Sequence, residues 1–408
     1  MTEALAERAS LAALLSPATI RERARNVLAA AEAGRTRHFR VDRAQLAHAA
    51  DVVVDVTRRR YPTLAIPYHS RWRHFEAGGV DRGDLLTRAL AGRDAAECAR
   101  ARIDLAVVSV LLDAGAGSAW TYVEAQTGQR FTRSEGLGVA SFRAFMAGTF
   151  SSRRDDPLRA DAEALSRVDA AALGSAFQAS ERNPLLGVDG RVALLRRLGA
   201  ALVGSRASFA GRARPGGLYD ALAPARDGAL SAGDLLRALV GGLNGIWPSG
   251  NVQDGVALGD TWRHPNAGGD GPSAGWVPFH KLSQWLAYSL FEPFEWAGVR
   301  VVDRDALTGL PEYRNGGLLL DTGVLALRDP AAARVAHDVG SELVVEWRAL
   351  TVALIDALAD AVRAKLARPD LPLACVLEGG TWAAGRECAS SLRGGDPPLA
   401  IRSDGTVF

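Results

Sequence analysis

The sequence has few of the residues that stabilise disulfide-rich folds, with three cysteines among 408 residues. Cys98, Cys375 and Cys388 are too sparse and too unevenly spaced for a disulfide framework or a zinc site, so we expect no bound metal. No uncharged apolar run reaches the roughly twenty residues that a transmembrane helix needs. Glu3 and Glu7 stand among the first alanines, which argues against a signal peptide. We therefore expect a cytoplasmic protein with no membrane partner.

An excess of charge of one sign is also lacking, because 48 basic residues nearly balance 46 acidic ones and leave a net charge of +2. The basic residues are nearly all arginine. This balance gives no sign of the basic surface that a nucleic-acid partner would need. Hydrophobic residues make up 48% of the chain, which is enough apolar material for a large core. We expect a monomer or homodimer that binds a small molecule.

The common signatures of nucleotide-binding proteins and hydrolases are absent as well. The chain has no GxGxxG that opens a βαβ unit, no GxxxxGK[ST], no HExxH and no GxSxG. No repeat of solenoid length is visible. Nucleotide-binding, zinc-protease and serine-hydrolase functions therefore lack support, and we expect no cofactor.

Apolar residues recur at helical spacing along most of the chain, and strand signals gather near its end. Residues 207–232 have the composition of a surface loop, and the long irregular stretch 244–278, rich in tryptophan, favours a binding loop. Residues 373–377 are expected to form a strand that pairs with 398–408, and a glycine turn and a helix are expected after it, up to residue 386. The pattern predicts a mainly α protein with a small β element near the C-terminus. Helices are expected over 3–33 (two, with a break at 16–17), 42–60, 83–113 (two), 134–149, 154–178, 183–204, 231–243, 279–290, 317–325 and 330–366.

Residues 66–75 combine histidine, arginine and aromatic side chains at a density that helix patterning does not require. One interpretation is an anion site, with Arg71 and Arg73 as guanidinium forks for phosphate and His69 and His74 as further donors. The other is a connector whose polar groups cap neighbouring helices. The residues alone favour neither.

Residues 279–325 carry the most chemistry. Lys281 begins an apolar helix, at the edge of its buried face. Glu312, Tyr313 and Arg314 follow at the start of a second helix, beside proline and glycine, where charged groups are well placed to face a pocket. Glu312 is the candidate catalytic carboxylate, and Lys281 or Arg314 could hold it ionised.

Structural roles compete with each of these assignments. From the residues alone, a helix cap and a structural ion pair are favoured for Glu312 and Arg314, and Lys281 could extend from an apolar helix to solvent. Tyr313 fits packing better than acid catalysis. Asp321 lies on the apolar helix 317–325, where a buried structural role is favoured over a catalytic one.

Other polar residues complete the set of candidates for substrate contact. Glu342 and Glu346 are four residues apart on one helix face, which is unfavourable unless a cation or a substrate lies between them. Asp113 could instead cap a helix. Glu378 precedes a helix start that could bind an anion, or it pairs with Arg386 and closes the tail onto the core. The substrate-contacting candidates in this set are Asp113, Trp262, His280, Glu346, Glu378 and Arg386.

Five motifs together resemble the URC-pathway protein family of fungi and bacteria, and this resemblance covers essentially the whole chain. It implies a role in uracil catabolism, in a pathway thought to pass through a ribosyl-urea species. The motifs are residues 66–75, 279–285, 310–317, 377–386 and 403–408.

A more distant resemblance bears on the chemistry. Residues 279–284 and 305–314 are similar to the FYKRAQ and DELTxFADYR motifs of queuosine 5′-phosphate N-glycosidases, and residues 346–349 and 107–120 match two further segments. That family is helical, related in fold to helix-hairpin-helix DNA glycosylases, and hydrolyses a ribose–base bond. Glu312 stands where that family has aspartate, and the tail 371–408 is additional.

The two resemblances imply one two-lobed helical domain over 1–408, with 371–408 packed on it as a C-terminal extension. They also imply an N-glycoside hydrolase that cleaves a ribosyl-urea or phosphoribosyl-urea to urea and ribose or its phosphate. N-glycoside hydrolysis needs a carboxylate near an oxocarbenium-like transition state, a role that Glu312 can fill. The alternatives are a hydrolase of C–N bonds in a ring-opened pyrimidine nucleotide and a non-catalytic helical binding protein.

Overall fold

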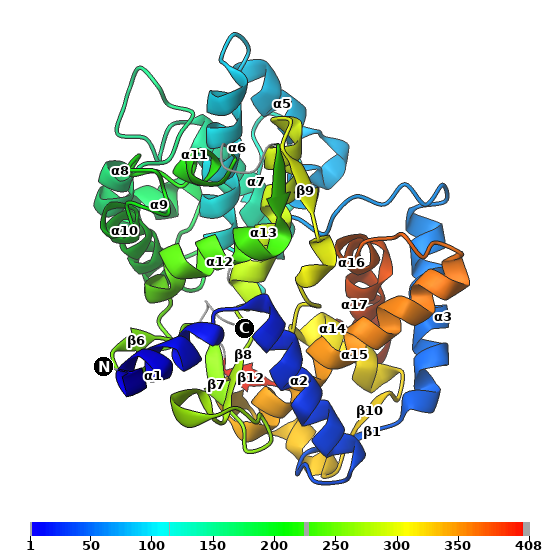
Figure 1. Ribbon diagram of the computed structural model, residues 1–408. Helices are drawn as coiled ribbons and strands as arrows, with labels where there is room; N and C mark the ends of the chain where they lie inside the picture. The colour runs from blue at the N-terminus through cyan, green and yellow to red at the C-terminus, as the bar shows by residue number, and fades with distance from the viewer. Residues whose placement is uncertain (1, 114, 224–227, 403–408) are drawn as a thin grey trace. The chain divides into compact units, whose positions relative to one another are not determined.

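A computed structural model describes residues 2–113, 115–223 and 228–402 (Figure 1). Helices account for 56% of the chain and the strands are small, which confirms the mainly α prediction. None of the helices within the described ranges has the length and apolar character that a membrane crossing requires. The motif at residues 403–408 lies outside the described residues, and the kinship with DNA glycosylases stays a prediction.

The chain divides into two compact units, and helix α13 (Lys281–Trp296) contributes residues to both. Unit 1 comprises Met1–His69, Ser249–Gln284 and Asp303–Phe408, and unit 2 comprises Ser70–Pro248 and Trp285–Val302. The helices of unit 1 are α1 (Thr2–Ala13), α2 (Pro17–Glu32), α3 (Leu46–Arg60), α14 (Tyr313–Asp321), α15 (Glu342–Leu366), α16 (Leu373–Val376) and α17 (Trp382–Arg393). Those of unit 2 are α4 (Trp72–Phe75), α5 (Arg82–Ala89), α6 (Ala95–Leu111), α7 (Arg133–Met146), α8 (Ala162–Arg167), α9 (Ala170–Ala176), α10 (Val188–Gly204), α11 (Gly217–Leu222) and α12 (Ala232–Leu243).

The strands are short and pair two by two. In unit 1 the pairs are β1 (Phe39–Val41) with β10 (Leu325–Leu327), β5 (Val252–Gln253) with β6 (Val256–Ala257), β7 (Thr261–Arg263) with β8 (Trp276–Pro278), and β11 (His337–Asp338) with β12 (Ile401–Arg402). In unit 2 they are β2 (Tyr122–Val123) with β3 (Arg130–Phe131), and β4 (Ala229–Ser231) with β9 (Arg300–Val302). The β11–β12 and β4–β9 pairs are parallel and the others antiparallel.

Helix α15 is the centre of unit 1. It packs against α2, α3, α14 and α16, and Figure 1 shows α2 and α3 on either side of it. Most of its residues are buried on every face, as expected for a helix enclosed by others. Two of its few polar residues, Glu346 and Arg348, are also buried, so each needs a partner inside unit 1.

Helix α6 has the corresponding place in unit 2, where it packs against α7, α10 and α11. Its buried Asp104 accepts hydrogen bonds from the Arg214 guanidinium (2.6 Å) and from the backbone N–H of Gly216 (2.6 Å). This pair fastens the segment before α11 to the core. The prediction of a surface loop over 207–232 was therefore wrong in part, because this stretch contains the buried Arg214, helix α11 and strand β4.

Three expected elements differ in extent. The long helix begins at Glu342, because Pro330 opens only a 3₁₀ turn that leads into β11. In the stretch 154–178, where helix was expected, residues before Ala162 are not helical and the remainder forms α8 and α9. The irregular stretch 244–278 contains β5 to β8.

The C-terminal tail differs in kind. The expected strand and glycine turn are instead α16 and a π-helical segment, Leu377–Thr381, that runs directly into α17. Gly379 and Gly380 allow this segment to pack closely against α3. A Cβ on Gly380 would lie 2.5 Å from both Thr57 Oγ1 and the Val53 carbonyl of α3. Strand β12 pairs with β11 and not with the tail segment before it.

Candidate active site

Glu312 is the N-cap of α14. Its Oε1 accepts the Asn315 N–H at 2.7 Å and its Oε2 accepts the Arg314 N–H at 2.8 Å. The side chain is only partly buried. The capping role considered from the sequence is thus present, and it holds both carboxylate oxygens in one fixed orientation at the positive end of a helix.

A buried ion pair holds the backbone around Glu312 and Lys281. The Arg348 guanidinium binds both oxygens of Asp260 at 2.7 Å, and neither side chain is more than 6% exposed. Asp260 accepts the Lys281 N–H at 3.0 Å, while Arg348 donates to the carbonyl of Pro311 at 3.3 Å. One ion pair therefore ties the start of α13 to the residue before Glu312.

The same carboxylate organises the neighbouring loop. Trp262 donates its indole N–H to Asp260 Oδ1 at 2.8 Å, and the backbone N–H of Phe279 donates to the Asp260 carbonyl at 2.9 Å. Burial raises the pKa of Asp260, but the charge and hydrogen bonds of Arg348 outweigh burial and leave the pKa below its usual range. Asp260 is ionised at neutral pH and acts as a fixed anchor.

Arg314 lies among aromatic rings. Its guanidinium carbon is 4.4 Å from the Trp382 ring centroid and 4.7 Å from that of Tyr313. Arg386 lies over the other rim of the cluster, 5.6 Å from the Trp382 ring centroid. The cation expected to pair with Glu312 is thus stacked on the tail helix α17, where it can still present N–H groups at its edge.

His69 and Glu378 meet in the interior of unit 1. His69 Nδ1 lies 2.9 Å from Glu378 Oε2, and both side chains are 7% exposed. The other oxygen of Glu378 accepts from Arg60 Nη2 and from the Tyr61 hydroxyl, both at 3.0 Å. Glu378 therefore connects the tail to the core of unit 1. Its partners in this contact are Arg60 and His69, whereas the sequence suggested Arg386.

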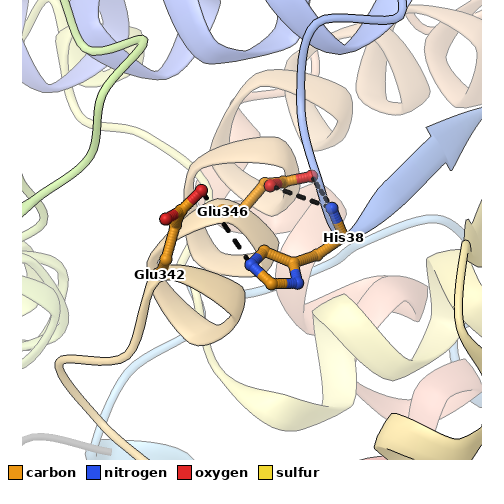
Figure 2. A group of neighbouring side chains, drawn as sticks. All are labelled: His38, Glu342 and Glu346. Carbon is orange, nitrogen blue, oxygen red and sulfur yellow. Dashed lines mark hydrogen bonds and ion pairs between the residues drawn. The ribbon is translucent and has the colours of Figure 1, made fainter.

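Glu342 and Glu346 lie on successive turns of α15 and face His38 (Figure 2). His38 Nε2 is 3.9 Å from Glu342 Oε1, and the His38 backbone N–H lies 3.3 Å from the Glu346 carboxylate. Phe39 N–H donates to Glu346 Oε1 at 2.9 Å. The unfavourable pair expected from the sequence is therefore separated by N–H donors at the start of β1.

These three residues bring potential metal ligands within 4.8 Å of one another. Glu346, however, already accepts the backbone N–H groups of His38 and Phe39, and His264 Nε2 lies 3.7 Å from its Oε2, beyond hydrogen-bond distance. His264 Nδ1 accepts the Asn266 N–H at 3.1 Å, so the neutral ring carries its proton on Nε2 and directs it at Glu346. The carboxylate has little capacity left for a cation, and its geometry fits an anchor for β1.

Two predicted residues lie apart from Glu312. Asp321 ends the nine-residue helix α14, about 13 Å along the axis from its start, and both its oxygens bind Arg393 at 2.8 and 2.7 Å. His280 is 1% exposed and its Nε2 lies 3.0 Å from the Leu14 carbonyl, which suits a structural role. The structure does not bring either side chain to the capped turn.

The remaining four candidates belong to unit 2 and have partners there. Arg71 is fully buried, 2.6 Å from Ser109 Oγ and 3.1 Å from Asp113 Oδ1. Arg73 binds Glu292 at 2.6 Å, and the His74 ring packs edge-on against Trp285 in the same unit. Both guanidinium groups face carboxylates, so a phosphate would compete with ion pairs already made. The anion-site interpretation stays a prediction.

Asp260, Arg60 and Tyr61 were not among the candidates from the sequence. Asp260 falls in an irregular loop without periodicity, and the only signal was its position between a glycine and the Thr261–Arg263 strand that carries Trp262. Arg60 and Tyr61 lie at the end of the helix expected over 42–60, where no local pattern indicates a buried partner. Only the tail, more than 300 positions away, reveals their partner.

Comparison with known proteins gives one family and two similar proteins. Residues 13–408 match the family described as "Protein of unknown function (DUF1688)". The chain is 41% identical to "Protein urg3" of Schizosaccharomyces pombe over 98% of its own length and 99% of that protein's. It is 39% identical to "Uracil catabolism protein 4" of Lachancea kluyveri, covering 92% of this chain and 93% of that protein.

Proposed function

Because the chain belongs to the DUF1688 family and is similar over almost its whole length to a protein named for uracil catabolism, we propose that it is an enzyme of uracil catabolism. The reaction we propose is hydrolysis of an N-glycosidic bond, which converts ribosyl-urea or its 5′-phosphate to urea and ribose or ribose phosphate. The observation that carries this proposal is the capped Glu312, fixed beside the backbone of Lys281 by the Asp260–Arg348 pair.

The chemistry asks little of the protein beyond well-placed charge. As the C1′–N bond breaks, positive charge develops on C1′ and the ring oxygen, and a nearby carboxylate stabilises it. Glu312 is already oriented by two backbone N–H groups, so it need not reorganise during the reaction. Each of its oxygens retains a lone pair that can orient the attacking water.

Lys281 and Arg314 would bind the polar edge of the substrate. A ribosyl-urea carries sugar hydroxyls and a urea carbonyl, all of which accept hydrogen bonds from an ammonium or a guanidinium. Stacking on Trp382 keeps the Arg314 fork planar and oriented, which lowers the entropy lost when it binds. A 5′-phosphate would add a stronger acceptor for the same cations.

The decisive experiment is incubation of the purified protein with synthetic ribosyl-urea and, separately, its 5′-phosphate. Urea and reducing sugar are measured in the same sample. We expect the two products in equal amounts. Ammonia without urea would replace the glycosidase with a hydrolase of another C–N bond, and no turnover of either compound would contradict the proposal.

A further inference from the structure

The His69–Glu378 contact has the geometry of a carboxylate that orients an imidazole. Glu378 Oε2 lies 2.9 Å from His69 Nδ1, and two further groups, Arg60 and Tyr61, hold the opposite oxygen. A carboxylate fixed on both sides cannot turn away from the ring. The Nδ1 position therefore carries a proton, and Nε2 is the nitrogen at which His69 can gain or release its second proton.

The backbone that supplies Glu378 is irregular in a way that serves this contact. Glu378 belongs to the π-helical segment Leu377–Thr381, and such segments interrupt α-helices mostly at functional positions. Arg60 Nη1 also donates to the Glu378 carbonyl at 2.6 Å, so backbone and side chain are held by one guanidinium. The wider turn lets Gly380 lie against α3 while the Glu378 side chain reaches His69.

The electrostatics keep Glu378 charged. Burial raises its pKa, but the hydrogen bond and charge of His69, the charge of Arg60 and the Tyr61 hydroxyl together leave the pKa below the usual glutamate range. The other ring contact of the tail, Trp382, lies 6.0 Å from the His69 ring between centroids.

That indole connects His69 to the proposed reaction site. Trp382 is also the ring on which Arg314 stacks, and Arg314 is in the first turn of the helix that Glu312 caps. Trp382 thus contacts both the His69 imidazole and the Arg314 guanidinium. His69 and Glu312 belong to the same unit, on segments joined through α17.

We propose that His69 is the general acid of the reaction and that Glu378 is its positioning residue; this inference rests on the proposed glycosidase function. As the C1′–N bond breaks, its electron pair passes to the urea nitrogen, which takes the proton from His69 Nε2. Water adds to C1′ and gives up a proton that restores the imidazolium through solvent. Urea leaves neutral, and no other reactant is needed.

The test compares two substrates that differ in their need for an acid. Urea is a poor leaving group without a proton, whereas p-nitrophenolate leaves readily as the anion. We expect His69→Gln to lower kcat/KM for ribosyl-urea by about 10²- to 10⁴-fold and to change hydrolysis of p-nitrophenyl riboside little. Glu312→Gln should impair both substrates, because both pass through the same cationic transition state.

The pH profile supplies a second measurement. Activity on ribosyl-urea requires the protonated ring, so kcat/KM falls on the basic side, and that limb should disappear in His69→Gln. Glu378→Gln weakens the contact that orients the ring, so it should lower kcat/KM for ribosyl-urea and change hydrolysis of p-nitrophenyl riboside little. The matched control is Glu387→Gln, which removes an exposed carboxylate of α17 that binds Arg59 of α3 at 2.7 Å and should leave the activity and its pH profile unchanged.

The outcomes separate the two proposals. A wild-type protein that releases sugar from ribosyl-urea, together with His69→Gln of normal activity on that substrate, overturns the acid assignment and leaves the glycosidase standing. Normal activity of Glu378→Gln on ribosyl-urea overturns the positioning role of Glu378. Equal loss on both substrates in His69→Gln also overturns it. A wild-type protein that releases no sugar from either substrate overturns the glycosidase and the acid with it.

Discussion

At Glu312 a single carboxylate has a structural and a proposed chemical role. The two N–H groups that it caps fix its orientation, and the same orientation directs its charge outward from the start of α14. The two roles of Glu312 can therefore be measured separately. Loss of the cap lowers stability, and loss of charge near the reacting carbon lowers turnover.

We expect Glu312→Gln to lower kcat by about 10²- to 10⁴-fold with little change in KM, because charge stabilisation acts mainly in the transition state. The free energy of unfolding should fall by only about 1 kcal/mol, since the amide oxygen can still accept one cap bond. Glu312→Asp should keep part of the activity. Turnover on ribosyl-urea and melting temperature are measured on the same preparations.

Asp169→Asn is the control for the cap alone, because Asp169 caps α9 through the Ala172 N–H in unit 2. It should cost similar stability and leave turnover unchanged. Normal turnover in Glu312→Gln would remove Glu312 from the catalytic assignment.

Asp321 should behave in the opposite way. Its carboxylate is buried and bound on both oxygens by Arg393 at the far end of α14. Asp321→Asn should lower the unfolding free energy by about 1 to 3 kcal/mol, because a charged hydrogen-bonded pair is broken. Urea denaturation and the ribosyl-urea assay are the measurements. A large loss of turnover at unchanged stability would restore the catalytic role considered from the sequence.

At the scale of elements, periodic sequence patterns predicted helices, whereas elements that depend on close packing with distant segments could not be predicted from the sequence. The boundary at Ser16 and Pro17, the two helices before Asp113 and the helix over 232–243 follow directly from proline positions and apolar spacing. The tail was misassigned because two adjacent glycines normally indicate a turn. Their reason lies in α3, over 300 residues earlier in the chain, and no local pattern can carry that information.

The candidate site also contains residues that local sequence signals predict and residues that only the tertiary structure reveals. Glu312 and Lys281 could be found because a carboxylate and a lysine beside helix starts leave local signals. Asp260 could not be found, because an aspartate in an irregular loop becomes significant only when Arg348 of a distant helix lies 2.7 Å away. Buried ion pairs depend on tertiary structure, and the sequence shows the two partners only as separate charges.

The packing of the tail on α3 can be tested at Gly380. Gly380→Ala adds a methyl group where a Cβ would lie 2.5 Å from backbone and side-chain atoms of α3, so we expect a loss of about 1 to 3 kcal/mol. Gly190→Ala in α10, where a Cβ meets no atom within 4 Å, should instead raise stability by about 0.5 to 1 kcal/mol. Thermal unfolding compares the two variants, and equal effects would contradict this reading of the π-helical segment.

Across the whole molecule, arginines are paired with buried carboxylates in both units. In unit 2, burial raises the pKa of Glu124, but hydrogen bonds from Arg82, Thr127 and Arg143 lower it to about 2. Asp260 and Glu378 in unit 1 are shifted in the same direction. A carboxylate with a depressed pKa contributes stability above its unfolded pKa of about 4, and this contribution is lost as pH falls through the folded value.

We therefore expect the urea midpoint to be nearly constant above about pH 5 and to fall steadily toward pH 2. Glu124→Gln should be less stable at pH 7 and should lose less on acidification, because its contribution is already absent. Urea titrations at several pH values measure both curves. Parallel curves for the two proteins would show that Glu124 is not the source of the acid sensitivity.

The division of unit 1 into three separated segments has a consequence for synthesis. His69 and Glu378 are 309 positions apart, so at ribosomal rates of about 5 to 20 residues per second Glu378 is made roughly 15 to 60 s after His69. For that interval the nascent chain carries α2 and α3 before α15, the helix they enclose, has been translated. Helices α2 and α3 therefore lack their partner α15 while unit 2 is translated. The His69 imidazole can contact the Glu378 carboxylate only after the tail has been translated.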